Sequence, residues 1–277
     1  MAVWSMMRLT FQEAMRRRIG LTALVLGAAF IALHGIGLYY IKLDLTSHIS
    51  STSMGARQFY NFMLIAGMYV VNFLTVAMSA LVSADTLAGE ISSGTIQSLA
   101  SKPIRRSEIV LGKWLGFALL LALYVLLMAG GLTIDVWLQT GYGPDNLFSG
   151  LALIYFEGLI IMTVTLAAST SLSTLATGGM VFGLYGLAFV GSWVEQIGAY
   201  LENQAAIQVG ILSSLIMPTE ALWRLAAHQM TSPLVAMLAG GPFVSTSVPS
   251  LWMVVYAVVY ALGILALALR LFARRDL

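Results

Sequence analysis

Residues 87–113 read LAGEISSGTIQSLASKPIRRSEIVLGK and lie between two long apolar runs, near Phe59–Ser83 and Trp114–Leu138. A bilayer core of about 30 Å is crossed by roughly 20 apolar residues of helix, and both runs reach that length. The segment between them carries acids, hydroxyl groups, a proline and four basic residues. It is therefore a polar connection between two membrane spans, accessible from one membrane surface.

The composition of the whole chain indicates a protein that faces lipid. Of the 277 residues, 59% are hydrophobic and only 9% are charged, and the mean hydropathy is +0.89. Soluble proteins carry about 25% charged residues, so this excess of apolar side chains is too large for a water-bounded core. We predict an all-α polytopic membrane protein, with residues 1–277 forming a single transmembrane domain.

Six stretches have the length and hydropathy of a transmembrane helix. They lie near Gly20–Ile41, Phe59–Ser83, Trp114–Leu138, Phe148–Ser169, Gly178–Tyr200 and Leu251–Leu271. The first follows three arginines but is too long for the apolar region of a signal peptide, so we expect it to be retained.

The basic residues are distributed unevenly, and this predicts the orientation. Six spans place both termini on one side of the membrane, and Lys and Arg accumulate on the cytoplasmic side. Only Lys42, Arg57 and Arg224 fall on the opposite side. We therefore expect both termini to be cytoplasmic, in the cytoplasmic (inner) membrane of a bacterium or archaeon. The residues expected on the cytoplasmic side are Arg8, Arg16, Arg17, Arg18, Lys102, Arg105, Arg106, Lys113, Arg270, Arg274 and Arg275.

Residues 3–18 have the pattern of a helix lying in the inner membrane interface. Glu13, Arg16 and Arg17 lie off an apolar stripe, which suits a helix with one face toward lipid. A short cytoplasmic extension of the first span is the alternative. The stripe consists of Trp4, Met7, Phe11, Ala14 and Met15.

Residues 201–250 are too long for a turn and too interrupted for another span. Their apolar runs are short and are broken by Pro218, Pro233, Pro242 and Pro249. Such runs favour re-entrant helices on the outer face, and a plain extracellular loop is the alternative.

The polar connection, residues 84–113, predicts a cytoplasmic coupling loop with its own helix. Over 81–100, small and polar residues alternate with apolar ones, which is typical of an amphipathic helix that Gly94 would allow to bend. Asp85 and Glu90 near its beginning and Lys102 after its end suit the helix dipole. Pro103 then ends the helix.

This segment contains, in order, an acid, a Gly-Thr pair, a Leu, a Pro, a basic pair and Gly-Lys. In this pattern it resembles the first cytoplasmic loop of ABC-2-type transporter permeases. The resemblance extends over nearly the whole chain. It implies that Glu90, Gly94 and Thr95 belong to a coupling helix that binds an ATPase subunit. The predicted ATPase-coupling interface comprises Asp85, Glu90, Ser93, Gly94, Thr95 and Arg105.

A second motif lies before the last span: Pro218, Thr219, Glu220 and Arg224. It resembles the outer element of the permeases associated with nitrous-oxide reductase maturation. The resemblance implies an assembly of two permease subunits, identical or related, with two ATPase subunits that bind ATP and Mg.

Several classes of protein are excluded or disfavoured by what the sequence lacks. Gly112-Lys113 is followed by Trp and lacks the upstream glycine of a phosphate-binding loop, so no cofactor is expected on this chain. Hydrolase motifs and cysteine are absent, and the methionines are scattered, so we expect no catalytic residue and no metal site. The net charge of +2 gives no indication of nucleic-acid binding.

Polar groups inside the predicted spans are candidate functional residues. Glu157 and His34 lie at similar depths and could touch, either as a polar lining of a substrate or proton path or as a hydrogen-bonded pair within the bundle. Gly179 and Gly183 have the small-residue spacing of a helix-packing interface, within one subunit or between two.

The sequence thus predicts the permease subunit of an ATP-binding cassette exporter with an unidentified substrate. One alternative is mechanotransmission, in which ATP-driven movement acts on an extracytoplasmic partner without bulk flux. Another is an ion-coupled secondary transporter, which would need an intramembrane charge network.

Overall fold

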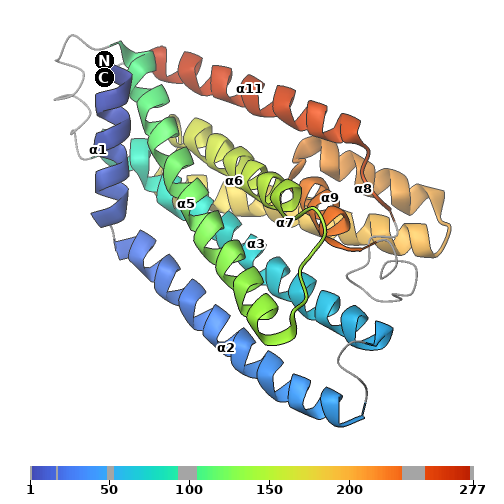
Figure 1. The fold of residues 1–277 in the computed structure, drawn as a ribbon. Coiled ribbons are helices and arrows are strands. Elements are labelled where there is room, and N and C mark those ends of the chain that lie inside the picture. Colours follow the sequence, from blue (N-terminus) through green and yellow to red (C-terminus); the bar gives the residue numbers. More distant parts are fainter. Residues whose placement is uncertain (1, 17, 49–52, 93–104, 233–246, 275–277) are drawn as a thin grey trace.

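The computed structural model describes residues 2–16, 18–48, 53–92, 105–232 and 247–274. Every regular element in these ranges is an α-helix, which confirms the predicted all-α class (Figure 1). The helices are α1 (Ala2–Arg16), α2 (Arg18–His48), α3 (Met54–Ser92), α5 (Arg106–Thr140), α6 (Leu147–Ser169), α7 (Thr174–Tyr200), α8 (Gln204–Ile216), α9 (Thr219–Met230) and α11 (Leu251–Ala273).

Six of these helices are long and apolar enough to cross a membrane, as predicted. They are α2, α3, α5, α6, α7 and α11, so the chain is a multi-pass membrane protein. The predicted end of the second span was too early, because α3 continues beyond Ser83 to Ser92 without a break. The first part of the predicted coupling helix is therefore the end of α3, and residues 93–104 lie outside the described ranges.

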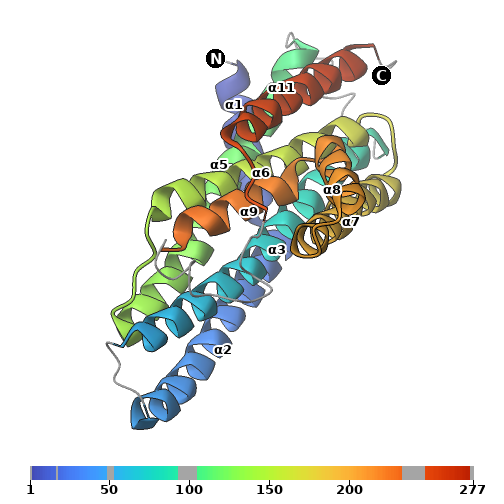
Figure 2. The ribbon, with the colours of Figure 1, turned by 90° about the vertical axis from the view of Figure 1, so that its right-hand side faces the viewer.

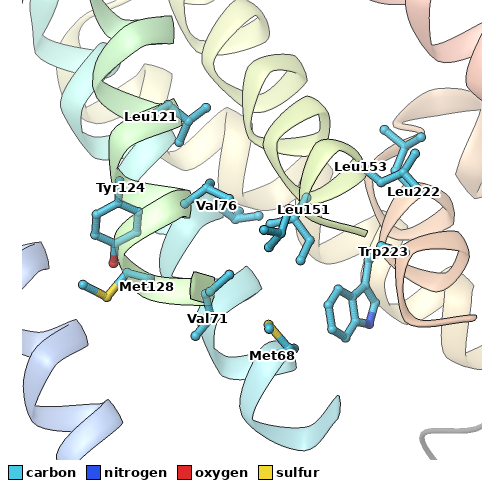
Figure 3. Packing of buried hydrophobic residues seen from close by; sticks show 14 of the residues in the cluster. Met68, Val71, Val76, Leu121, Tyr124, Met128, Leu151, Leu153, Leu222 and Trp223 are labelled. Atoms are coloured by element: carbon cyan, nitrogen blue, oxygen red, sulfur yellow. The ribbon is translucent and has the colours of Figure 1, made fainter. Parts of the chain in front are cut away.

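The centre of the bundle is formed by α3, α5 and α6, with α9 packed against α6. Figure 3 shows apolar side chains from all four helices meeting in one cluster. In Figures 1 and 2, α2 runs along one side of the bundle, and α8 and α9 lie on the other. Most side chains of α2 and α11 stay exposed, as is expected for helices that face lipid. The labelled members of the cluster are Met68, Val71, Val76, Leu121, Tyr124, Met128, Leu151, Leu153, Leu222 and Trp223.

A second, smaller group of buried side chains joins five helices at one end of the bundle, and we call it the terminal cluster. It consists of Met6, Leu87, Ile109, Val110, Leu166 and Phe272, from α1, α3, α5, α6 and α11. Nearby, Arg106 Nη1 donates a hydrogen bond to the Ala273 carbonyl oxygen (3.2 Å). The beginning of α1 and the end of α11 therefore lie at the same end of the bundle (Figure 1).

Helix α1 packs against the beginning of α5 through two glycines. A Cβ atom at Gly112 would collide with Met6 Cβ, and one at Gly116 would lie 2.8 Å from Thr10 Cβ. The buried face of α1 is thus Met6, Thr10 and Ala14, spaced four residues apart. Of the predicted apolar stripe, Trp4 and Met15 are exposed, whereas Ala14 is buried in the bundle. The interfacial position of α1 stays a prediction.

Helix α8 runs antiparallel to α7 and is then followed by a sharp bend. Ala206 packs on Gly198, and Ser213 packs on Gly191, so the direction of α8 is opposite to that of α7. The axes of α8 and α9 differ by 106° across Met217 and Pro218. This bent pair is either a broken span or a re-entrant segment, so the predicted re-entrant helices stay a prediction.

The predicted glycine interface is not formed within the described part of this subunit. A Cβ atom added at Gly179 or Gly183 would meet nothing within 4 Å. The close helix contacts of α7 instead occur at Gly191 and Gly198, toward its other end. An interface between two subunits is the alternative that remains for Gly179 and Gly183.

Candidate functional site

The two ends of the polar connection are joined by a buried ion pair, which we call the loop clamp. Lys113 Nζ, in α5, donates a hydrogen bond to Glu90 Oε1, in the last turn of α3. The Lys113 side chain is 2% exposed and that of Glu90 is 12% exposed. Because Lys113 is largely shielded from solvent, removing Glu90 would leave the ammonium charge poorly compensated.

The remaining described residues of the predicted coupling interface also make contacts within the chain. Thr174 Oγ1, at the beginning of α7, donates a hydrogen bond to Asp85 Oδ1 (3.2 Å). Arg105 is the exposed residue before α5, and its backbone N–H donates to Glu108 Oε2 (2.9 Å).

Glu90 has a partner within its own chain, since its carboxylate contacts Lys113. The predicted contact of Glu90 with the ATPase stays a prediction. Glu90 and Asp85 fasten the end of α3 to α5 and α7. Ser93, Gly94 and Thr95, predicted to contact the ATPase, lie outside the described residues.

In the outer motif, Arg224 of α9 forms a bidentate ion pair with Glu195 of α7. Arg224 Nη1 and Nη2 lie 2.8 Å from Glu195 Oε1 and Oε2, respectively. Ser247 Oγ also donates to Glu195 Oε1 (2.7 Å). Both charged side chains are buried, and two parallel hydrogen bonds fix their relative orientation. This pair joins α9 to α7 and, through Ser247, to the chain four residues before α11 begins.

The acid of the outer motif, Glu220, lies in the first turn of α9 and interacts with Tyr185 of α7 and Glu157 of α6. Asn72 of α3 is the other polar neighbour of Glu157. We call Asn72, Glu157, Tyr185 and Glu220 the carboxyl cluster. All four side chains are buried, and Glu157 is 0% exposed. Four helices thus contribute polar groups to one apolar part of the bundle.

Pro218 and Thr219, the first residues of the outer motif, form the corner between α8 and α9. Both are buried, and Pro218 directly precedes α9. Because proline lacks a backbone donor, it suits the start of a helix. The motif therefore places Glu220 and Arg224 one turn apart on α9, where they meet different partners.

Glu157 and His34 have different partners, so the structure does not bring them together as a pair. His34 Nε2 lies 3.2 Å from the Met63 carbonyl oxygen, and His34 Nδ1 lies 3.8 Å from Asp135 Oδ2. These contacts place His34 among α2, α3 and α5, whereas Glu157 interacts with Asn72 of α3 and Glu220 of α9.

Sequence reasoning missed Glu195, Asn72 and Tyr185. One signal was available, because Arg224 is the only Lys or Arg in residues 201–250 and Glu195 is an acid inside a predicted span. Charged groups at membrane depth are usually paired, so this combination predicts their contact. No comparable signal identifies Asn72 or Tyr185, since neutral polar residues are common within spans.

Comparison with known proteins identifies the family. The profile of a family described as "ABC-2 family transporter protein" matches residues 4–277. The "Probable ABC transporter permease protein NosY" of Pseudomonas aeruginosa is 26% identical over 291 residues, which cover 99% of both chains. The protein of the same name from Stutzerimonas stutzeri is 30% identical over 129 residues, 46% of this chain and 43% of that protein. The chain therefore belongs to the ABC-2 family of transporter proteins and is a membrane-spanning ABC transporter subunit.

Proposed function

We propose that this chain is the permease subunit of an ATP-driven exporter. ATP hydrolysis by two separate ATPase subunits displaces the coupling loop, residues 84–113, and this displacement rearranges the helices of two permease subunits. The chain itself supplies the pathway and no catalytic group.

One observation carries this proposal: the loop clamp and the terminal cluster join both ends of the coupling loop to the rest of the bundle. Glu90 and Lys113 connect α3 to α5, and Leu87 and Ile109 belong to the same packed group. Because packed interiors deform little, a force on residues 93–104 would move α3 and α5 together. Helices α1, α6 and α11 contact the same cluster and would follow.

Mechanotransmission is the second candidate, and the Arg224–Glu195 pair favours it. This pair fastens α9 to α7, whose first residue contacts Asp85 at the loop end of the bundle. Movement of the loop could therefore reach the α8–α9 pair through α7 alone. An extracytoplasmic partner that binds there would receive the movement without any flux.

The test is a bulky substitution in the loop, measured in the complex with the ATPase subunit. Gly94→Trp should leave membrane insertion and thermal stability near wild type while it reduces ATPase co-purification and ATP-dependent activity. The matched control is Gly143→Trp in the α5–α6 connection, where an added Cβ meets nothing within 4 Å.

Normal assembly and turnover of the Gly94→Trp complex would contradict the proposed coupling role of the loop. If coupling is confirmed, substrate-stimulated ATP hydrolysis would support export. ATP-dependent binding of an extracytoplasmic partner without flux would instead support mechanotransmission.

A further inference from the structure

The carboxyl cluster contains buried acceptor atoms that have no donor. Among the described residues, no donor reaches either Glu157 oxygen in hydrogen-bond geometry, although the Asn72 side chain interacts with this carboxyl group. Glu220 Oε1 and Asn72 Oδ1 are also without a donor in that part of the chain. Asn72 is 2% exposed and Glu220 is 3% exposed, so bulk solvent does not reach these side chains. Buried polar atoms are normally paired, and four unsatisfied acceptors beside one another indicate a missing positive or donating group.

Charge counting leads to the same conclusion. The region holds three carboxyl groups, from Glu157, Glu195 and Glu220, and one guanidinium group, from Arg224. Arg224 uses both terminal nitrogens on Glu195, although its charge also acts on Glu220. If every acid were ionised, the buried region would carry a net charge of −2, which an apolar interior opposes strongly.

Within the described residues, the helices packed around Glu157 supply no further positive charge there. The titratable groups that interact with Glu157 are Tyr69 of α3, Tyr185 of α7 and Glu220 of α9, and Arg224 of α9 interacts with Glu220. Helix α5 presents Leu121 at the adjacent Gly158. Helix α11 has no charged residue before Arg270, which lies in its last turn.

We propose that Glu157 and Glu220 form a proton-binding carboxyl pair inside the helix bundle. A proton on Glu157 removes one charge and creates the O–H donor that the neighbouring acceptors lack. Glu220 is the proposed acceptor for that donor, and Glu220 also interacts with Tyr185 of α7. Two adjacent carboxyl groups in an apolar site cannot both ionise readily, so the pair titrates as a unit.

The pair also links proton binding to the position of α9. Glu157 belongs to α6 and Glu220 to α9, so sliding one helix along the other would separate the two carboxyl groups. Because linkage is reciprocal, the protonation state would in turn favour one position of α9.

The experiment is infrared spectroscopy of the purified full-length protein over a pH series. The wild type should show the carbonyl band of a protonated carboxylic acid near neutral pH, and Glu157→Gln should remove or shift it while the protein stays monodisperse. Absence of this band in the wild type would overturn the proposal. Loss of the band on adding sodium chloride, but not choline chloride, would also overturn it, in favour of a sodium site.

Dicyclohexylcarbodiimide reacts with protonated carboxyl groups in apolar surroundings. Labelling with it therefore identifies which residues give rise to the infrared band. Glu157 or Glu220 should be labelled, with a rate that falls about tenfold per pH unit once the pair has titrated. Glu195 is the internal control, because Arg224 Nη1 and Nη2 bind both of its carboxylate oxygens. Labelling of Glu195 at the rate of Glu157 would show that access alone governs the reaction, and would contradict the assignment of the proton to the pair.

Discussion

The loop clamp makes a quantitative prediction about stability. Glu90→Gln or Lys113→Met removes one charge and leaves its partner in a site where Lys113 is 2% and Glu90 is 12% exposed. Breaking a buried ion pair by removing one partner costs about 3–5 kcal/mol. Because Glu90 is still partly exposed, we expect the lower end, about 3 kcal/mol for each single variant.

The double variant Glu90→Leu/Lys113→Met distinguishes the clamp from two independent contributions. Replacing both charges by apolar side chains removes the desolvation cost together with the attraction, which is often neutral or stabilising. We therefore expect the double variant to be within about 1 kcal/mol of wild type, although two independent losses would sum to about 6 kcal/mol.

The assay is the apparent unfolding midpoint of the purified protein, measured in one detergent for all variants. A loss of about 3 kcal/mol corresponds to a decrease of roughly 6–12 °C for a chain of this size. Glu108→Gln is the control, because this exposed cap at the same end should cost less than about 1 kcal/mol. Single variants that each lose under about 1 kcal/mol, with effects that add in the double variant, would refute the clamp.

Two further predictions concern the outer motif and the topology. Arg224→Met leaves the buried Glu195 carboxylate without its guanidinium partner and should lower the free energy of unfolding by about 3–5 kcal/mol. The double variant Arg224→Met/Glu195→Leu should recover most of that loss. An unchanged unfolding midpoint in the single variant would contradict a buried pair. Reporter fusions after Leu277 and within residues 95–105 should be cytoplasmic, and a fusion near Gly143 should be external, because eleven basic residues lie on one side and three on the other. An external C-terminus would exclude the six-span arrangement.

The sequence predicted those parts of the fold that depend on hydropathy along the chain. The six spans follow from apolar length alone, and the position of both termini at one end of the bundle follows from their even number. The end of α3 was placed too early because Asp85 and Glu90 look like surface residues. In the structure they are held by Thr174 and Lys113, which hydropathy does not reveal.

The candidate site was predicted only in part, since partners come from packing rather than from the sequence of one helix. Glu157 was identified because an acid within a span is costly, but its nearest polar neighbours come from α3 and α9, which lie far from it along the chain. His34 was paired with it on depth alone, and depth does not fix which side of a helix a residue occupies. Gly179 and Gly183 fit a packing motif, yet Gly191 and Gly198 make the close contacts.

The packing of α1 on α5 has a consequence for biosynthesis. Met6 and its contact Gly112 are 106 residues apart (112 − 6), so at about 5–20 residues per second α1 waits roughly 5–20 s before its partner is made. Phe272, which completes the terminal cluster, is translated later still. The terminal cluster is therefore complete only after α11 has been synthesised, and a chain interrupted before α11 would hold the ends of residues 84–113 without that support.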